Sequence, residues 1–310
     1  MLDCAIIGGG PAGLTAGMYA ARGGLKEVVV FEKVYPGGQI VSSSEIENYP
    51  GFNEIKSGID FMDSWVPQAQ KFGCVVKSGA GVSKISKNSE FFTIELDDGQ
   101  TYEARTVIMA AGTKPRKAGF EGEDEYFGRG VGVCAVCDGF FYRKKDVAVV
   151  GGGDSAVEES FFLSQFCNKV YLLARSELKA APHTIERLRK TPNVEIIEGV
   201  NIIKAYGDAT GLTGIEYFCN NQDIKLAVAG VFVFAGRTIN NESIKTENGY
   251  ICATDKSGHI VVDLKMCSSL DGFFAAGDIR IDSGHQVVCA AGDGAIAASS
   301  AIEYIHNKGL

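Results

Sequence analysis

The sequence predicts an α/β fold built around two βαβ units. Two stretches carry this prediction, "CAIIGGGPAGLTAGMYAARGGLKEVVVFEK" near the N-terminus and "DVAVVGGGDSAVEESFFLSQFCNKVYLLAR" near the middle of the chain. Each contains a short apolar strand, a glycine-rich turn, a helical pattern and a second apolar strand. The chain has 310 residues, 45% of them hydrophobic and 22% charged, which suits a globular protein of one large domain or two of ordinary size.

In the first stretch the expected elements are the strand Cys4–Ile7, the helix Leu14–Arg22 and the strand Val28–Phe31. Glu32 follows the second strand directly. The turn has the spacing G-x-G-x-x-G, so the whole dinucleotide-binding βαβ fingerprint is present together with its terminal acid. An acid at that position accepts hydrogen bonds from ribose hydroxyls.

Gly8, Gly10 and Gly13 have separate tasks in this fingerprint. Gly8 makes the turn, Gly10 lets a pyrophosphate approach the backbone, and Gly13 lets the helix pack close to the strand. The phosphates would lie at the helix N-terminus, where unpaired N–H groups and the helix dipole favour anions. The alternative is a glycine-rich turn in some other kind of α/β protein.

The second stretch repeats the pattern. Its expected strands are Val147–Val150 and Lys169–Leu173, with a helix between them. Gly151, Gly153 and Ala156 give its turn the spacing G-x-G-x-x-A. Because this is a variant of the same fingerprint, a second dinucleotide site is predicted here.

The two units differ at the residue that follows the second strand. Counting 24 residues on from Gly8 leads to Glu32, and the same count from Gly151 leads to Arg175. An acid selects a free 2′-hydroxyl, whereas an arginine accommodates a 2′-phosphate. We therefore expect a dinucleotide like FAD on the first unit and one like NADPH on the second, unless Arg175 is a solvated surface charge. Two such sites imply electron transfer between a nicotinamide and a flavin.

Two further apolar strands end in glycine and suit the flavin site, although such strands are common in any α/β sheet. The first is "TVIMAAGTKPR", Thr106–Arg116, and the second is "GFFAAGDIR", Gly272–Arg280. Asp278, at the end of the second strand, is placed to bind another part of the nucleotide, such as the ribityl chain of a flavin.

A Cys-x-x-Cys pair, Cys134 and Cys137, precedes the second unit and is followed by Asp138. Of the nine cysteines, only these two have a spacing that suggests chemistry. A metal site, a structural disulfide and electron transfer are the three explanations. The four histidines show no ligand spacing, so no metal is expected. The two dinucleotide units favour redox catalysis.

Charge and hydropathy exclude several classes of partner. The net charge is −8, whereas nucleic acids and anionic membranes favour a basic face. The N-terminus lacks the basic segment of a secretion signal, and no stretch reaches the roughly 18 apolar residues of a spanning helix. We expect a cytoplasmic protein that binds neither nucleic acid nor membrane. Most of its other cysteines should be buried small hydrophobic residues.

Taken together, these segments resemble the low-molecular-weight thioredoxin reductases of bacteria, and the resemblance covers essentially the whole chain. The motifs occur in that family's order, and the cysteine motif with its aspartate is the most specific of them. They are "GGGPAG" with Glu32, "GGQI" at Gly37–Ile40, "EIENYPG" at Glu45–Gly51, "AAGTKPR", "CAVCDGFFYR", "GGGDSA" and "FAAGDIR".

The resemblance implies two Rossmann-like domains, each a three-layer ββα arrangement, with the nicotinamide domain inserted into the FAD domain. The FAD domain would comprise residues 1–115 and 243–310, and the NADPH domain, which carries the redox cysteines, residues 116–242. A homodimer and a large rotation of one domain against the other are also implied. Because the same cysteines must meet both the flavin and a protein disulfide, hinges are expected near 113–117 and 241–245.

The motifs also imply the residues that bind each cofactor. For FAD they are Gly8, Gly10, Pro11, Ala12, Gly13, Glu32, Lys33, Gly38, Gln39, Ile40, Asn48, Ala111, Gly112, Gly277, Asp278, His285, Gln286 and Val287. For NADPH they are Gly151, Gly153, Asp154, Ser155, Ala156, Arg175, Ser176 and Lys179. A helix is expected from about residue 286 to residue 304.

The redox steps follow from the same resemblance. Electrons would pass from NADPH to FAD, then to the Cys134–Cys137 disulfide and finally to oxidised thioredoxin. Cys137 matches the cysteine that faces the flavin, and Cys134 the one that attacks the substrate disulfide. Asp138 matches the acid/base that protonates the departing thiolate.

Four residues beside the cysteines match positions that meet thioredoxin in the family: Arg129, Phe140, Phe141 and Arg143. For the two phenylalanines, simple core packing is an equally good explanation. For Arg129, a local ion pair with the acidic run at 121–125 is equally plausible.

One segment departs from the family pattern. Where members have His-Arg-Arg-x-x-x-Arg after the second nucleotide strand, this chain has "ARSELK", residues 174–179. Arg175 matches the first arginine, but Ala174 replaces the histidine and Ser176 the second arginine. Lys179 stands in for the last arginine. Each lost charge-assisted hydrogen bond would cost roughly 1.5–3 kcal/mol. We therefore expect a weakened preference for NADPH over NADH, or a different reductant.

The leading interpretation is a thioredoxin-disulfide reductase. One alternative is a related flavin-dependent reductase of another redoxin or of a small dithiol, with an altered reductant. The other is a non-catalytic flavin-binding sensor whose cysteines report redox state.

Overall fold

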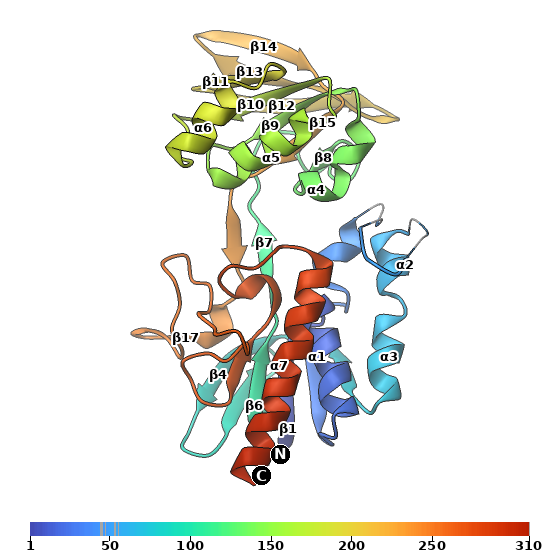
Figure 1. Ribbon diagram of the computed structural model, residues 1–310, viewed down its shortest axis with the longest axis vertical. Coiled ribbons are helices and arrows are strands. Elements are labelled where there is room, and N and C mark those ends of the chain that lie inside the picture. The colour runs from blue at the N-terminus through green and yellow to red at the C-terminus, as the bar shows by residue number, and fades with distance from the viewer. Residues whose placement is uncertain (44–45, 47, 53, 55, 310) are drawn as a thin grey trace. The chain divides into compact units, whose positions relative to one another are not determined.

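The computed structural model describes residues 1–43, 46, 48–52, 54 and 56–309 (Figure 1). The chain divides into two compact units, Met1–Lys114 with Ile239–Leu310, and Pro115–Thr238. Two short strands, β7 (Thr113–Pro115) and β16 (Arg237–Ile239), carry the chain between the units and pair with each other.

The first unit contains a seven-stranded sheet in the order β3-β2-β1-β6-β5-β4, with β19 also paired to β6. The pairs β1–β2, β1–β6, β2–β3 and β6–β19 are parallel, whereas β4–β5 and β5–β6 are antiparallel. The strands are β1 (Leu2–Ile7), β2 (Val28–Glu32), β3 (Val75–Ser78), β4 (Val82–Lys87), β5 (Phe92–Leu96), β6 (Thr101–Met109) and β19 (Phe273–Ala275), with a small β17 (Lys245–Thr246) and β18 (Gly249–Tyr250) pair. The helices are α1 (Pro11–Arg22), α2 (Gly58–Met62), α3 (Trp65–Lys71) and α7 (Val287–Lys308), with 3-10 turns η1 (Gly38–Ser42), η3 (Glu242–Ile244) and η4 (Gly277–Ile279).

Alternate residues of β1 serve two separate cores, because successive side chains of a strand point to opposite faces. Ile6 packs with the alanines of α1 and α7 on one face. Ile7 packs with Phe92 and Ile94 of β5 on the other. The unit therefore has one helical layer and two β layers, and its central parallel strands are buried on both sides, as parallel strands usually are.

The second unit contains a five-stranded parallel sheet in the order β11-β10-β9-β15-β8 and a separate antiparallel sheet, β12-β13-β14. The strands are β8 (Val131–Gly132), β9 (Asp146–Val150), β10 (Lys169–Ala174), β11 (Val194–Glu198), β12 (Asn201–Asp208), β13 (Gly211–Cys219), β14 (Gln222–Ala227) and β15 (Gly230–Val233). The helices are α4 (Ala135–Asp138), α5 (Asp154–Ser164) and α6 (Pro182–Arg189), with the 3-10 turn η2 (Gly139–Tyr142) after α4.

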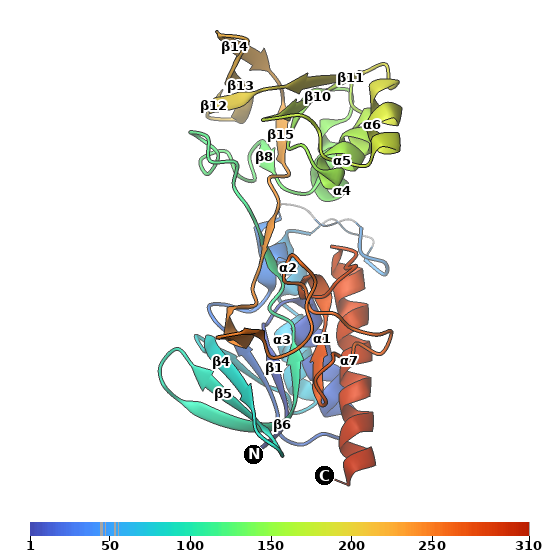
Figure 2. The same ribbon diagram turned by 90° about the vertical axis from the view of Figure 1, so that its left-hand side faces the viewer.

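The same alternation divides the core of the second unit. Val147 and Val149 pack with residues of α5 and α6, including Leu163. Ala148 and Val150 pack with β12 and β13 on the opposite face. Both views show the small antiparallel sheet on one side of the parallel sheet and α5 and α6 on the other (Figure 2). The predicted fold class, two three-layer ββα units, is confirmed.

Element boundaries differ from the expected ones mainly at helix ends. The first helix begins at Pro11, three residues before Leu14, because proline suits the first turn of a helix. The last helix was expected to end near residue 304 but continues to Lys308. It ends where Gly309 adopts a left-handed conformation, with φ of +64°, as glycines after helices commonly do.

Helices α1 and α7 lie side by side in both views (Figures 1 and 2). Their backbones approach so closely that a β-carbon added at Gly294 would lie 2.2 Å from the carbonyl oxygen of Ala12. By contrast, a β-carbon at Gly292, on the exposed face of α7, would meet no atom within 4 Å. The close packing of α7 against α1 therefore requires glycine at position 294, whereas no packing contact requires glycine at position 292.

These two glycines predict opposite effects of the same substitution. Gly294→Ala should destabilise the protein by roughly 1–3 kcal/mol, because the added methyl group pushes α7 from α1. Gly292→Ala should stabilise it by about 0.5–1 kcal/mol, since alanine is the better helix former. Urea unfolding of both variants checks this. Equal changes in the two free energies of unfolding would contradict the assigned α1–α7 contact.

Candidate functional site

The first glycine turn is shaped by two positions that exclude a side chain. Gly8 has φ of +109°, and a β-carbon there would lie 2.4 Å from the carbonyl oxygen of Ala110. A β-carbon at Gly13 would lie 1.8 Å from the carbonyl oxygen of Gly8. The turn therefore brings β1 and α1 as close as the fingerprint requires.

Helix α1 offers an anion site at its N-terminus. Gly10 is the N-cap residue, and as a glycine it has no side chain to cap the first N–H groups of the helix. Pro11 occupies the first helical position. A β-carbon at Gly10 would make an ordinary 3.6 Å contact with Gly38 and would fill the space beside these N–H groups. The donors and the open backbone fit a dinucleotide pyrophosphate.

Glu32 lies at the end of β2 beside this turn. Its carboxylate accepts hydrogen bonds from the N–H of Gly9 at 2.8 Å and from the N–H of Val34 at 3.0 Å. The chain then returns, and Gly37 donates its N–H to the carbonyl oxygen of Gly9 at 2.8 Å. Gly38 approaches so closely that a β-carbon there would lie 3.0 Å from the α-carbon of Gly10.

The other first-unit candidates gather around the carboxyl ends of β1, β6 and β19, the edge where open α/β sheets bind ligands. Gln39 donates its Nε2–H to the carbonyl oxygen of Thr113 at 2.7 Å. Asn48 donates its Nδ2–H to Oε1 of Gln286 at 3.2 Å, although the two lie 238 positions apart. Ile40 and Val287 share one apolar cluster. Of the Glu45–Gly51 motif, Glu45 and Glu47 lie outside the described residues.

Asn240 holds the segment after β6, and the sequence did not point to it. Its Nδ2–H donates to the carbonyl oxygen of Ala111 at 2.8 Å, and its backbone N–H to that of Gly112 at 3.1 Å. Gly112 itself has φ of +64°. Lys33 does not join this group through a polar contact, because its ammonium pairs with Asp97 at 3.0 Å on an exposed surface.

Asp278 lies in η4, directly after β19. Ser283 donates its Oγ–H to Oδ1 of Asp278 at 3.0 Å, and Nδ1 of His285 lies 3.4 Å from Oδ2. A β-carbon at the neighbouring Gly277 would lie 3.0 Å from that of Ala12, which places η4 against the start of α1. The predicted residues of η4 and of the glycine turn thus come together.

A buried ion pair that supports this site was not predicted from the sequence. Nε of Arg280 lies 2.7 Å from Oδ2 of Asp293, and Nη2 lies 2.9 Å from Oδ1. Asp293 also accepts the N–H of Gly277 at 3.1 Å, so α7 holds η4 through one carboxylate. The sequence did contain a signal, because Asp293 is the single charged residue between positions 287 and 302.

The second glycine turn repeats the geometry of the first. Gly151 has φ of +153°, and a β-carbon there would lie 2.6 Å from the carbonyl oxygen of Phe234. Gly153 is the N-cap residue of α5, has no side-chain cap, and a β-carbon there would meet nothing within 4 Å. Buried Ala156 takes the third position. The open N-terminus of α5, with exposed Ser155 in its first turn, fits a second pyrophosphate.

The loop after β10 carries the remaining NADPH candidates. Lys179 donates its N–H to the carbonyl oxygen of Gly152 at 2.7 Å, which matches the Gly37–Gly9 bond of the first unit. Asp154 accepts the N–H of Ala181 at 2.9 Å and so holds the end of this loop. Arg175, Ser176 and the side chain of Lys179 are exposed.

Cys134 and Cys137 form a disulfide, with their α-carbons 5.3 Å apart. Cys134 is the N-cap residue of α4, and its sulfur accepts the N–H of Cys137 at 3.2 Å. The pair is half-buried, with Ala135 buried and Val136 exposed between the cysteines. The other seven cysteines are free, and five of them are buried. Burial raises the pKa of the Cys4 and Cys74 thiols to about 12.

Asp138 ends α4 and faces back toward β8. A β-carbon at Gly132 would lie 3.2 Å from Oδ2 of Asp138, and Oδ1 is buried. Burial and, secondarily, the charge of Asp138 raise the pKa of Tyr142 to about 12. The carboxylate therefore lies between the strand that precedes the disulfide and the turn that follows it.

An aromatic surface adjoins the disulfide. Phe140 is 54% exposed and packs one face against Phe166, with ring centroids 5.4 Å apart, while Arg143 lies over its ring. Phe141 is also exposed. Core packing therefore does not explain either phenylalanine. Arg129 lies over the ring of Tyr126 and contacts the backbone carbonyl of Glu125 rather than a carboxylate.

In the described part of the chain, no group of three or more His, Cys, Asp or Glu side chains is arranged to hold a metal ion. In the same residues, no helix has the length and apolar character needed to cross a membrane.

Comparison with known proteins gives full-length matches. Residues 2–294 match the family described as pyridine nucleotide-disulphide oxidoreductase. A thioredoxin reductase of Helicobacter pylori (strain J99 / ATCC 700824) is 49% identical over 99% of this chain and 100% of its own. One of Listeria innocua serovar 6a is 38% identical over 98% of this chain and 93% of its own.

Two solved structures are similar over nearly the whole chain. The thioredoxin reductase of Streptococcus pyogenes MGAS5005 has a TM-score of 0.92 at 36% identity, and 99% of each chain is covered. That of Giardia duodenalis has a TM-score of 0.92 at 31% identity, over 98% of this chain and 99% of the other.

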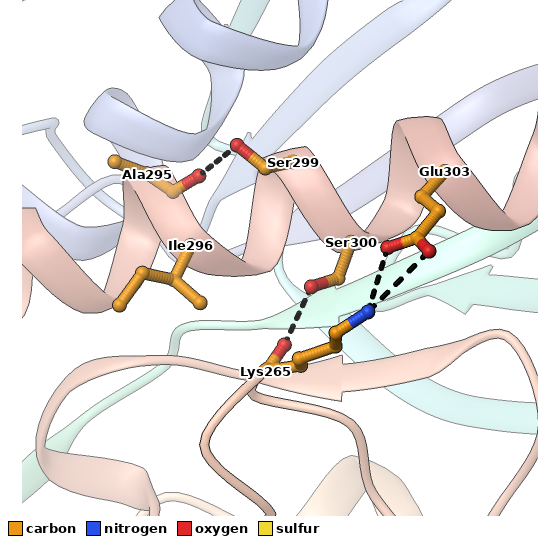
Figure 3. Close-up of a pocket in the computed structure, with 6 residues that line it drawn as sticks. All are labelled: Lys265, Ala295, Ile296, Ser299, Ser300 and Glu303. Carbon is orange, nitrogen blue, oxygen red and sulfur yellow. Dashed lines mark hydrogen bonds and ion pairs between the residues drawn. The ribbon is translucent and has the colours of Figure 1, made fainter.

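Two ion pairs made by residues of α7 test whether the carboxylate of Asp293 holds η4 in place. Asp293→Ala should destabilise the protein by roughly 3–5 kcal/mol, because it leaves the guanidinium of Arg280 buried without its partner. It should also lower the flavin content. The exposed pair between Lys265 and Glu303, 3.0 Å long, lies in a shallow surface depression on the same helix (Figure 3).

Glu303→Ala is therefore the matched control, and it should change stability by about 0–1 kcal/mol. Thermal unfolding and the ratio of flavin to protein absorbance measure both effects. Normal flavin content in the Asp293 variant would show that η4 does not depend on α7.

Proposed function

The chain belongs to the pyridine nucleotide-disulphide oxidoreductase family, with thioredoxin reductases as its full-length relatives, and we propose that its Cys134–Cys137 disulfide is where electrons leave for thioredoxin. It is an FAD-containing oxidoreductase that uses NADPH, like the thioredoxin reductases of this family. The position of the disulfide carries the proposal. It lies on α4, just before the glycine turn of one dinucleotide unit, in a chain that has a second such unit.

The first unit is proposed to bind FAD and the second NADPH. For the first, the open turn at Gly10, the acid at Glu32 and the cluster at Asp278 are the support. For the second, the open turn at Gly153 and the cation at Arg175 are the support. When bound, NADPH supplies a hydride and FAD relays its two electrons to a disulfide.

The cysteines perform a disulfide exchange. Reduction breaks the Cys134–Cys137 bond and, with two electrons and two protons, leaves two thiols. As a thiolate, Cys134 attacks one sulfur of the thioredoxin disulfide and forms a mixed disulfide, while the other thioredoxin sulfur leaves as a thiolate. Cys137 then attacks Cys134, which restores the original disulfide and releases the second sulfur of reduced thioredoxin.

Asp138 is proposed to protonate the thiolate that departs when the disulfide opens. Its backbone N–H donates to the carbonyl oxygen of Cys134 at 3.2 Å, so the carboxyl group is carried by the same turn of helix as the sulfurs. A positioned acid of this kind contributes roughly 10²–10⁴-fold to a rate. The exposed Phe140, Phe141 and Arg143 are proposed to contact thioredoxin.

The two units are proposed to change their relative orientation during turnover, because one disulfide must serve both a flavin and a protein substrate. The chain crosses between units at 114–115 and at 238–239, and these two links are the candidate hinges. The second link lies before the segment 241–245 suggested by the resemblance. A homodimer in the cytoplasm is proposed from the resemblance, and the net charge of −8 supports the absence of a nucleic-acid partner.

A cysteine variant tests the exchange. Cys134→Ser should leave bleaching of the flavin by NADPH intact and abolish reduction of thioredoxin, because no thiolate remains to attack the substrate. Cys267→Ser, at a half-buried free cysteine outside the motif, is the control and should retain turnover. Anaerobic flavin absorbance and a dye-linked thioredoxin assay measure the two steps. Near-normal turnover by the Cys134 variant would refute the assigned role.

A second variant tests Asp138. Asp138→Asn should lower thioredoxin turnover about a hundredfold or more, since the acid is lost. It should also lower the pKa of Tyr142 below its present value of about 12, because a negative charge beside the phenol is removed. The dye-linked thioredoxin assay measures the rate. Turnover within a few-fold of the wild-type rate would contradict the role of Asp138 as the acid.

A further inference from the structure

The loop that follows β10 is fixed at its backbone while its charged side chains are exposed. Besides the Lys179–Gly152 and Ala181–Asp154 bonds, Leu178 donates its N–H to Oε1 of Glu198 at 3.0 Å. The side chain of Leu178 turns inward, 3.8 Å from where a β-carbon at Gly152 would lie. The loop is therefore held in one place, and its cations project from a defined backbone.

Glu198 lies beside the position where the family pattern has histidine. In the parallel pair β10–β11, Glu198 is in register with Ala174, the residue directly before Arg175. Adjacent strands are about 4.8 Å apart, so the backbone of Glu198 is the neighbour of Ala174, and its carboxylate reaches the loop at the N–H of Leu178. Ala174 is fully buried, and its side chain is only a methyl group. At this register the polar side chain therefore comes from Glu198 on the neighbouring strand.

Arg189 brings a further guanidinium to this carboxylate. Its Nη2 lies 3.9 Å from Oε1 of Glu198, the same oxygen that accepts the N–H of Leu178. The guanidinium therefore lies beside the loop backbone. The pair is at the limit of an ion-pair distance, and the Arg189 side chain is 61% exposed. Because such surface pairs are worth little, the guanidinium is available to a stronger anion.

We propose that Arg189 is a further ligand of the 2′-phosphate of NADPH, in place of the arginine that Ser176 replaces, and that Glu198 opposes the same phosphate. The inference rests on the proposed NADPH site of the second unit. A phosphate dianion competes for the guanidinium with more charge and more acceptors than one carboxylate. Glu198 weakens the contact between Arg189 and the phosphate in two ways. It pairs with the guanidinium, and it places a negative charge near the phosphate.

The alternative without a binding role is that Arg189 is simply a surface cation in the last turn of α6. Cations at that place are favourable to any helix, because the helix dipole is negative there. Lys190 provides the matched control, since it is the next residue, is exposed and is paired with Glu186 at 2.7 Å rather than with Glu198. Replacing either residue changes the net charge of the protein by the same amount.

The test measures binding without turnover. Adenosine 2′,5′-bisphosphate and AMP, which differ by the 2′-phosphate, are titrated calorimetrically into the purified flavoprotein, and the ratio of their dissociation constants is compared. Arg189→Gln should lower the preference for the bisphosphate about tenfold or more, and Arg189→Lys should lower it less. Glu198→Gln, which keeps an acceptor for the N–H of Leu178, should raise the preference.

The outcomes separate the inference from the function on which it rests. Equal effects of Arg189→Gln and Lys190→Gln would overturn the role of Arg189, and an unchanged or lowered preference in Glu198→Gln would overturn that of Glu198. In both cases NADPH would still bleach the flavin of the wild-type protein. Failure of the wild-type protein to prefer the bisphosphate, together with no bleaching by NADPH, would instead overturn the proposed function.

Discussion

The carbonyl oxygen of Gly8 would lie only 1.8 Å from a β-carbon at Gly13, and this close approach of a turn to a helix organises the first unit. It sets α1 against β1 so that uncapped N–H groups face the space at the carboxyl end of the sheet. Other elements then meet the same turn: Glu32 through the N–H of Gly9, η1 through Gly38, and η4 through Gly277 and Ala12. The ion pair between Arg280 and Asp293 ties this last element to α7.

The second unit repeats this construction and changes its chemistry at few positions. In both units the chain returns after the second strand and donates an N–H to the carbonyl oxygen of the middle glycine of the turn. The bond runs from Gly37 to Gly9 in the first unit and from Lys179 to Gly152 in the second. The last residue of that strand in the first unit is an acid, Glu32, whereas the residue directly after it in the second unit is a cation, Arg175. One architecture thus carries an acid at this position in one unit and a cation in the other, and the disulfide on α4 belongs to the second unit. The two proposed dinucleotide sites and one disulfide are the parts that an electron relay from NADPH to a protein substrate needs.

Much of this could be predicted from local sequence. The βαβ units, the roles of Gly8 and Gly13 and the disulfide pair all depend on residues close together in the chain. Contacts across long separations could not be predicted, because no local pattern specifies them. Asn240 at Ala111, Asp293 at Arg280 and Glu198 at the loop after β10 are of this kind. The exposed Phe140 was equally ambiguous in sequence, since an aromatic residue beside a helix is normally buried, and only the structure shows its free face.

The most direct test of the relay is the number of reducing equivalents that one chain accepts. NADPH delivers two electrons, the flavin holds two, and the Cys134–Cys137 disulfide takes two more. Anaerobic titration with NADPH, followed by flavin absorbance and by the appearance of reactive thiols, should therefore require two equivalents per chain and expose two new thiols. Complete bleaching by one equivalent, with no new thiols, would contradict the account, because the disulfide would then not be connected to the flavin.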